Sequence, residues 1–240
     1  MQVDHIKHIL FLDIETVPLI YDYHEAPEKI RKLFEKKVRY RLKDDITAED
    51  LYEQAGIWAE FGKVVAVAIG VVTIKNGKNK LVIKKIGYDD EKKVLTETAE
   101  ILRRFSEKHG EKTRLCAHNG KEFDFPYLAR RMLINRIPLP EILKVHGKKP
   151  WETPYCDTME LWQFGDRKHY TSLELLTEIL DIPSPKSDLD GSDVARVYYE
   201  EKDLERIKQY CASDVAALVN VYLRLHEQDI IPENDIEIQD

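Results

Sequence analysis

The chain has 240 residues, of which 43% are hydrophobic and 34% charged, and its net charge is −7. This length and composition predict a globular protein and exclude a disordered chain. The longest apolar run, Val64 to Val72, is too short to span a bilayer, and the N-terminus lacks a secretory pattern. Three cysteines without CxxC spacing argue against a disulfide framework and a zinc site. We therefore expect a cytoplasmic protein that does not bind membranes.

The charges are distributed unevenly along the chain. Residues 227–240 contain six acids and no Lys or Arg, whereas residues 29–43 contain eight basic residues and one acid. Such a basic run can attract phosphates locally, and a solvated helix face is the alternative interpretation. We predict a single domain over residues 1–226, with a helical insertion at about 20–60, followed by an acidic tail at 227–240.

The hydrophobic pattern predicts alternating strands and helices. In chain order we expect a strand at His8–Ile14, the helical insertion, strands at Lys63–Ile74 and Lys80–Ile86, a helix at Asp89–Lys108, a strand at Arg114–His118, a helix at Phe125–Asn135, a strand at Tyr155–Asp157, and helices at Ser172–Leu180 and Asp203–Glu227. Asn76-Gly77 predicts a tight turn between the second and third strands. This order indicates an α/β fold, in which a mixed sheet with three antiparallel first strands is flanked by helices.

Two carboxylates stand at the end of the first predicted strand. Alternation places Ile9, Phe11, Asp13 and Glu15 on one face, which is apolar until its last two members. Like charges at neighbouring positions repel unless a cation lies between them, and a divalent metal would satisfy both carboxylates. The alternative is that both are merely the exposed end of a strand before Pro18.

Another carboxylate interrupts the last predicted helix. Its inward stripe follows helical spacing and consists of Leu204, Ile207, Cys211, Asp214, Leu218, Val221 and Leu225. Asp214 thus occupies a buried position and needs a partner, and Tyr210 lies one turn before it. An ion pair with an arginine or a cap on a neighbouring helix is the alternative role for this aspartate.

A third acidic segment connects the fourth strand to the helix that follows it. Asp124 stands just before Pro126, where an N-capping aspartate would be ordinary. Asn119 and Gly120 have the character of turn residues. Taken alone, this segment favours a structural interpretation.

Together the three segments resemble the motifs of the DEDD exonuclease superfamily, which has an RNase H-like fold. The matching residues are Asp13-x-Glu15, Asn119-x-x-x-Phe123-Asp124 and Tyr210-x-x-x-Asp214. The tyrosine four positions before the last aspartate resembles the DEDDy branch, since the DEDDh branch would have a histidine where this chain has Gln209. The surrounding phrases are similar to stand-alone relatives of the exonuclease domain of family B DNA polymerases.

The resemblance implies a 3′–5′ exonuclease that releases 5′-mononucleotides. Asp13, Glu15, Asp124 and Asp214 would bind two Mg²⁺ or Mn²⁺ ions, the hard cations that oxygen ligands select. In the family, the first of these residues bridges both ions. Tyr210 would position the attacking water, because a phenol with a pKa near ~10 is a poor base at neutral pH.

The resemblance also implies substrate contacts by Asn119, Phe123, Thr16 and Lys186, although a plain surface loop is an open alternative for the lysine. Asp157 resembles a family aspartate near the site, and we expect it to support the sheet. The expected partner is nucleic acid with a free 3′ end, with single-stranded DNA favoured over RNA although no motif encodes that choice. An inactive binding module of the same fold and an RNase H-like endonuclease are the alternative functions.

Overall fold

The structure, a computed structural model, describes all residues except 1–4, 44, 76, 167–169 and 184–188. Its centre is a six-stranded sheet with the order β5-β4-β1-β2-β3-β6. The strands are β1 (Ile9–Pro18), β2 (Gly62–Lys75), β3 (Lys78–Gly87), β4 (Arg114–Ala117), β5 (Tyr155–Asp157) and β6 (Ile236–Gln239). Strands β1, β2 and β3 pair antiparallel, and the other neighbours pair parallel. The predicted mixed sheet with three antiparallel first strands is therefore confirmed.

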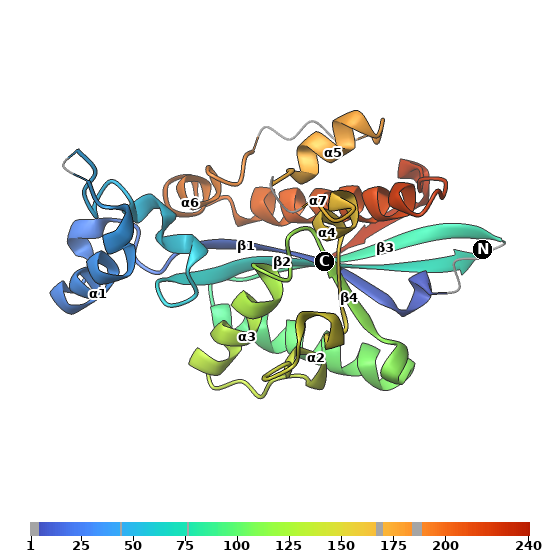
Figure 1. Ribbon diagram of the computed structural model, residues 1–240, viewed down its shortest axis with the longest axis horizontal. Helices are drawn as coiled ribbons and strands as arrows, with labels where there is room; N and C mark the ends of the chain where they lie inside the picture. The colour runs from blue at the N-terminus through green and yellow to red at the C-terminus, as the bar shows by residue number, and fades with distance from the viewer. Residues whose placement is uncertain (1–4, 44, 76, 167–169, 184–188) are drawn as a thin grey trace.

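Helices cover both faces of this sheet. The α-helices are α1 (Glu28–Val38), α2 (Glu91–His109), α3 (Asp124–Ile134), α4 (Thr158–Gln163), α5 (Leu173–Ile179), α6 (Val194–Arg196) and α7 (Leu204–Leu225). A π-helical turn follows at Val197–Glu201, and 3₁₀ helices lie at Ile6–His8, Tyr23–Glu25, Arg39–Arg41, Tyr52–Ile57, Gly110–Lys112, Glu141–Leu143, Pro150–Glu152 and Glu233–Asp235. In Figure 1, α7 lies along one face of the sheet, and α2 and α3 lie on the other. Within the described residues, no helix has the length and apolar character needed to cross a membrane.

The alternation of side chains along β1 separates two cores. Phe11 belongs to the core under α7, together with Val215. Leu12 points the other way and belongs to the core under α2 and α3, together with Leu102. Gly70 of β2 lets α7 approach closely, because a Cβ there would lie 2.7 Å from Cγ1 of Val215. By the same alternation, every second residue after Phe11 lies on the face of the sheet that α7 covers.

Residues 19–61, which we call the insertion lobe, connect β1 to β2 and lie beyond the end of β1 (Figure 1). The lobe has a small core of its own, in which Phe34 packs edge-on against Tyr52 and Phe61 with ring centroids 5.0 and 5.3 Å apart. Its two ends meet where the N–H of Leu19 donates to the carbonyl of Phe61 at 2.8 Å. The lobe is therefore a compact folded unit that extends from the end of β1.

The acidic end of the chain contributes the last strand. Strand β6 pairs parallel to β3, with Ile236 opposite Leu81. The acids on either side of it pair with lysines of β3: Asp235 lies 3.1 Å from Nζ of Lys80, and Asp240 lies 3.3 Å from Nζ of Lys85. The segment predicted as an acidic tail thus supplies an edge strand, and the acids that flank this strand pair with lysines of its neighbour.

Candidate active site

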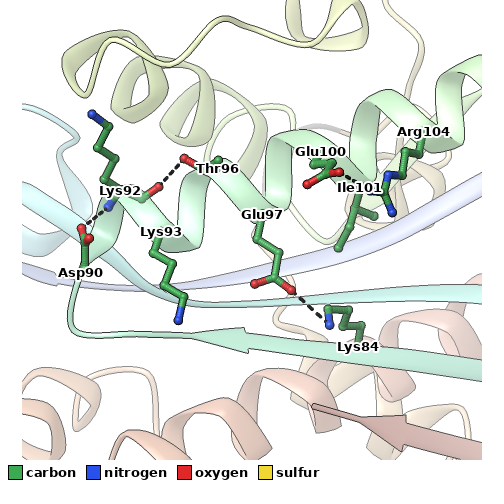
Figure 2. Close-up of a pocket in the computed structure, with 9 residues that line it drawn as sticks. All are labelled: Lys84, Asp90, Lys92, Lys93, Thr96, Glu97, Glu100, Ile101 and Arg104. Atoms are coloured by element: carbon green, nitrogen blue, oxygen red, sulfur yellow. Dashed lines mark hydrogen bonds and ion pairs between the residues drawn. The ribbon is translucent and has the colours of Figure 1, made fainter.

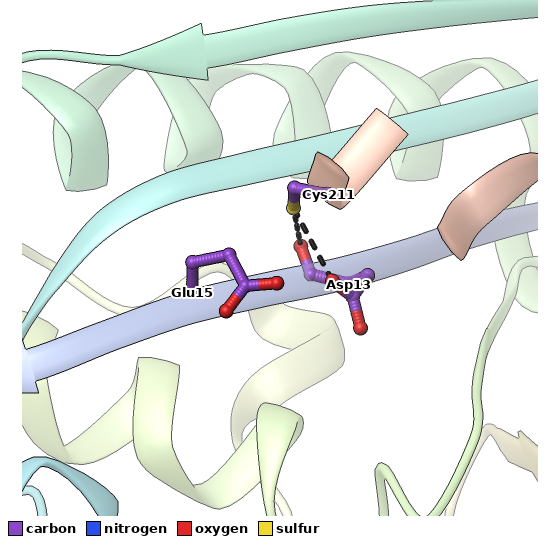
Figure 3. Close-up of side chains that lie close together, drawn as sticks. All are labelled: Asp13, Glu15 and Cys211. Atoms are coloured by element: carbon purple, nitrogen blue, oxygen red, sulfur yellow. Dashed lines mark hydrogen bonds between the residues drawn. The ribbon is translucent and has the colours of Figure 1, made fainter. Parts of the chain in front are cut away.

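The carboxylates of Asp13 and Glu15 lie on β1 beneath α7. Glu15 is only 8% exposed, so the pair is not the solvated end of a strand. The pairing of β1 with β2 shifts register between Glu15 and Thr16, a bulge that locally changes the direction of the strand. Ligating atoms of Asp13, Glu15 and Cys211 all lie within 4.8 Å of one another (Figure 3). Asp124 and Asp214 are not members of this closest group.

Cys211 reaches the first aspartate from α7. Its thiol donates to the backbone carbonyl and to Oδ2 of Asp13, both at 3.3 Å. Burial raises the pKa of this thiol, and the neighbouring carboxylates raise it further. Cys211 therefore remains a neutral donor that holds the Asp13 side chain, and the ligands offered to a cation are oxygen atoms. The inward stripe predicted the burial of Cys211 but not this contact.

Asp124 is the first residue of α3 and is bound to β1. It is 3% exposed, and its carboxylate accepts a hydrogen bond from the backbone N–H of Ile14. Its pKa is raised to about 8, chiefly by burial and to a smaller extent by the charge of Asp157. The N-cap of α3 is Phe123, which makes no side-chain capping bond. The capping interpretation of Asp124 is thus not supported.

Asp214 and Tyr210 lie one turn apart on α7. The Tyr210 hydroxyl donates to the Asp214 carboxylate. Burial raises the pKa of Asp214 to about 6, although this hydrogen bond opposes the rise. Burial and the carboxylates of Asp214, Glu15 and Asp13 raise the pKa of Tyr210 well above its usual value. The phenol therefore stays protonated at neutral pH and acts as a hydrogen-bond donor.

The four carboxylates influence one another electrostatically. Burial raises the pKa of Asp13, and Glu15, Asp124 and Asp214 raise it further in that order. Among the described residues, no Lys, Arg or His nitrogen lies within 4 Å of any of the four carboxylates. Buried like charges without a cationic partner are costly, and a divalent cation would compensate them. The donor chemistry of this cluster therefore fits a hard divalent cation.

Asp157 shapes the loop that leads from β4 to Asp124. Its carboxylate accepts hydrogen bonds from the backbone N–H groups of Asn119, Lys121 and Met159 at 2.9, 3.1 and 3.0 Å. Asn119 has a left-handed backbone with φ of 59°. Among the described residues, its buried Oδ1 has no hydrogen-bond partner. Asp157 thus supports this loop directly, and an acceptor on Asn119 is left for another donor.

The remaining predicted substrate contacts differ in their surroundings. Phe123 is half-buried, and its ring centroid lies 5.3 Å from that of Tyr127. The Thr16 hydroxyl donates to the Tyr127 hydroxyl, which in turn donates to the carbonyl of Gly56 at 2.7 Å. These contacts give Thr16 a structural role within the fold. Lys186 lies outside the described residues.

Tyr170 also lies beside the carboxylates, although the motifs do not include it. It is 68% exposed, and its ring centroid lies 6.4 Å from that of His118. Partial burial raises the pKa of Tyr170, and the charges of Asp124 and Asp157 raise it further. His118 itself lies 2.9 Å from Oγ1 of Thr158 and 2.8 Å from the carbonyl oxygen of Thr171, measured from its two ring nitrogens. No local sequence signal distinguishes Tyr170 from the other tyrosines of the chain.

A separate groove lies between α2 and β3 (Figure 2). Its lining is mostly charged, and four of these charges form two ion pairs. Lys84 lies 3.1 Å from Glu97, and Arg104 pairs with Glu100. The groove is on the α2 side of the sheet, whereas Asp13 lies on the side that α7 covers. It is therefore distinct from the carboxylate cluster.

Comparison with solved structures identifies a similar fold. The family B DNA polymerase from the hyperthermophilic archaeon Pyrobaculum calidifontis matches with a TM-score of 0.53 and 15% identity, over 91% of this chain and 24% of the polymerase. The chain thus spans about a quarter of that protein. The RNase domain of the yeast Pop2 protein matches with a TM-score of 0.35 and 12% identity, over 96% of this chain and 81% of that domain. The expected RNase H-like fold is confirmed.

Sequence comparison assigns the family. No curated protein matches the chain. A family model described as a predicted 3′–5′ exonuclease related to the exonuclease domain of PolB matches residues 58–233, well over half of the chain. The match includes Asp124, Tyr210 and Asp214 and begins after Asp13 and Glu15. The chain therefore belongs to this family of predicted PolB-like 3′–5′ exonucleases.

Proposed function

We propose that this protein is a metal-dependent 3′–5′ exonuclease. Its substrate would be a single strand, DNA in preference to RNA, which it would shorten from the 3′ end to 5′-mononucleotides. The main support is the gathering of four carboxylates, two buried and two half-buried, from three distant segments, without a cationic side chain among the described residues to compensate them. Membership of the exonuclease family supports a nuclease independently of this geometry.

Asp13, Glu15, Asp124 and Asp214 would hold two divalent cations, Mg²⁺ or Mn²⁺. When bound, such ions supply an activated water and stabilise the departing 3′ oxygen. The cluster presents oxygen donors to them, because the Cys211 thiol remains protonated. The choice between the two metals and the number of ions are part of this proposal.

The residues of the chain itself would orient the reacting groups. Tyr210 would hold the attacking water by a hydrogen bond, since its phenol stays protonated beside Asp214. Cys211 fixes one carboxylate oxygen of Asp13, and the N–H of Ile14 fixes Asp124. These contacts orient the carboxylates before substrate binds, which lowers the cost of reaching the reactive arrangement.

The terminal nucleotide would lie against the loop that Asp157 supports. The half-buried side chain of Asn119, whose buried Oδ1 has no partner among the described residues, would turn to accept a hydrogen bond from a hydroxyl of the terminal sugar. Phe123, half-buried at the N-cap of α3, offers an aromatic ring. Stacking on such a ring tolerates any base, as an exonuclease that removes successive nucleotides requires.

The test is degradation of 30-nucleotide single strands of DNA and RNA that carry a label at the 3′ or the 5′ end, with Mg²⁺ or Mn²⁺. We expect immediate release of a labelled mononucleotide from the 3′ label and a descending ladder from the 5′ label. Asp13→Ala and Asp214→Ala should abolish both, whereas Glu107→Ala, at an exposed acid of α2, should act as wild type. Internal cuts would indicate an endonuclease, and binding without cleavage would indicate an inactive module. Either result would refute the proposal.

A further inference from the structure

The insertion lobe lies almost entirely outside the segment that the family model matches, which begins at residue 58. It also begins close to the candidate active site, because β1 ends at Pro18, three residues after Glu15. In Figure 1, α1 lies beyond this end of the strand. The lobe therefore lies where β1 leads away from the carboxylates.

One side of α1 is basic and exposed. Phe34 and Val38 bury the opposite side of the helix in the core of the lobe. We define the α1 basic face as the exposed cations that follow helical spacing and continue into the next 3₁₀ turn, namely Lys29, Lys32, Lys36 and Arg39. Lys32 forms an exposed pair with Glu28, which contributes little stability. Within the described part of the chain, no carboxylate lies within 4 Å of the charged groups of the other three.

Apolar side chains interrupt this charged surface. Tyr40 is 81% exposed and Leu33 is 47% exposed. A surface that only keeps a protein in solution does not need an exposed aromatic ring among its cations. Proteins that bind single strands combine basic side chains for phosphates with aromatic rings on which bases stack. A duplex hides the faces of its bases, so this combination favours a single strand.

The lobe is held at a fixed position on the rest of the molecule. The Tyr199 hydroxyl donates to the carbonyl of Pro18 at 2.5 Å, and the ring of Tyr21 stacks on Tyr199 with centroids 4.9 Å apart. From the other layer, Nη1 of Arg131 donates to the carbonyl of Ala59 at 2.8 Å. Cations on a rigid lobe can bind a strand without a further cost of ordering the lobe itself.

We infer that the α1 basic face, with Tyr40, binds the part of a single strand that leads away from the active site. This inference rests on the proposed function and extends it to a second contact region for the substrate. Its consequence is a dependence on length: a strand that reaches α1 binds more tightly than one that occupies only the active site.

The test compares two variants with equal changes of charge. Lys29→Glu/Lys32→Glu/Lys36→Glu reverses the three lysines of the α1 basic face. Lys92→Glu/Lys108→Glu/Lys112→Glu reverses three exposed lysines on α2 and the turn after it. Fluorescence anisotropy in EDTA measures the binding of 5-nucleotide and 30-nucleotide DNA strands without cleavage. We expect the first variant to bind the 30-nucleotide strand at least tenfold more weakly, with a slope of log K against log salt reduced by about 2 for three lost phosphate contacts. Its binding of the 5-nucleotide strand should not change.

Several outcomes would overturn the inference. One is an equal loss of affinity for the 30-nucleotide strand in both variants, which would indicate a general effect of charge. Another is an unchanged slope of log K against log salt in the α1 variant. Tyr40→Ala should also weaken the binding of the 30-nucleotide strand. If wild type bound a blunt duplex more tightly than the single strand, and through the same lysines, the single-strand assignment would be refuted. Cleavage of thymidine 5′-monophosphate p-nitrophenyl ester with Mn²⁺ reports on the chemistry alone. If wild type cleaves neither this ester nor any strand, the proposed function fails, whereas normal cleavage with unchanged strand binding refutes only the role of α1.

Discussion

The charge of Asp214 should destabilise the protein when no divalent cation is present. Burial raises the pKa of this carboxylate from 3.8 to about 6. Above that pH, the ionised group costs the folded state about 3 kcal/mol relative to the unfolded chain. Asp214→Asn removes the charge, retains an oxygen that accepts the hydrogen bond of Tyr210, and relieves repulsion on Asp13 and Glu15. The variant should therefore be more stable than wild type in EDTA, although it should have lost nuclease activity.

The assay is thermal unfolding in EDTA between pH 5 and pH 8. Because the pKa is higher in the folded state, the stability that protonation provides is present below the unfolded pKa and is lost as the pH rises through about 6. The Tm of Asp214→Asn should thus exceed that of wild type by about 5–10 °C at pH 8 and by roughly half as much at pH 5. Added Mn²⁺ should raise the Tm of wild type more than that of the variant, since the intact cluster binds it better.

Glu107→Gln, at an exposed position on α2, is the matched control and should leave the Tm unchanged at both pH values. The reasoning would be refuted if Asp214→Asn were no more stable than wild type at pH 8 in EDTA. It would also be refuted if the difference in Tm became smaller as the pH rose.

Other predictions concern single contacts. Tyr210→Phe should lower kcat at least tenfold with little change in KM, and an unchanged kcat would remove this phenol from the mechanism. Arg131→Met should lower the free energy of unfolding, measured by urea titration, by about 3–5 kcal/mol. The arginine Nη2 lies 2.5 Å from the buried carboxylate of Glu91, which would lose its cationic partner. A loss below about 1 kcal/mol would contradict this. Gly120→Ala should lower kcat while the protein stays folded. A Cβ at this position would lie 2.3 Å from Cβ of Ala117 and would displace the loop that contains Asn119. A kcat equal to that of wild type would show that the loop adapts freely.

Strand alternation predicted the two faces of β1 but not its length. The predicted strand ends at Ile14, whereas β1 continues to Pro18. The extension is polar and contains a proline, so its own pattern does not indicate a strand. It forms because β2 continues beside it, with Gly62 opposite Pro18. On the side of β4, only Ile9 to Phe11 of β1 are paired. No strand pairs with Pro18 on that side, so the missing N–H of the proline leaves no sheet hydrogen bond unformed.

Three acids of the candidate site were predictable because they conflict with their local pattern, whereas Asp124 fitted an ordinary capping position and was identified only by the resemblance. Asp13 continues the apolar face of β1, and Asp214 interrupts the apolar stripe of α7. The contacts that orient them could not be predicted in the same way. The thiol of Cys211 and the ring of Tyr170 reach the site only because distant elements pack together, and no spacing within one element reports such proximity.

The contrast between these two classes of residue has a physical basis. A charge in an apolar position lowers stability wherever it occurs, so it is visible in the sequence as an exception to burial. Its supporting contacts follow ordinary rules: Cys211 is a usual core residue, and the N–H of Ile14 is a backbone group that any residue except proline would supply. The destabilising acids therefore identify the site, whereas the fold determines how the site is oriented. It follows that substitutions of the acids should change activity and stability in opposite directions, and that substitutions of the supporting groups should lower both.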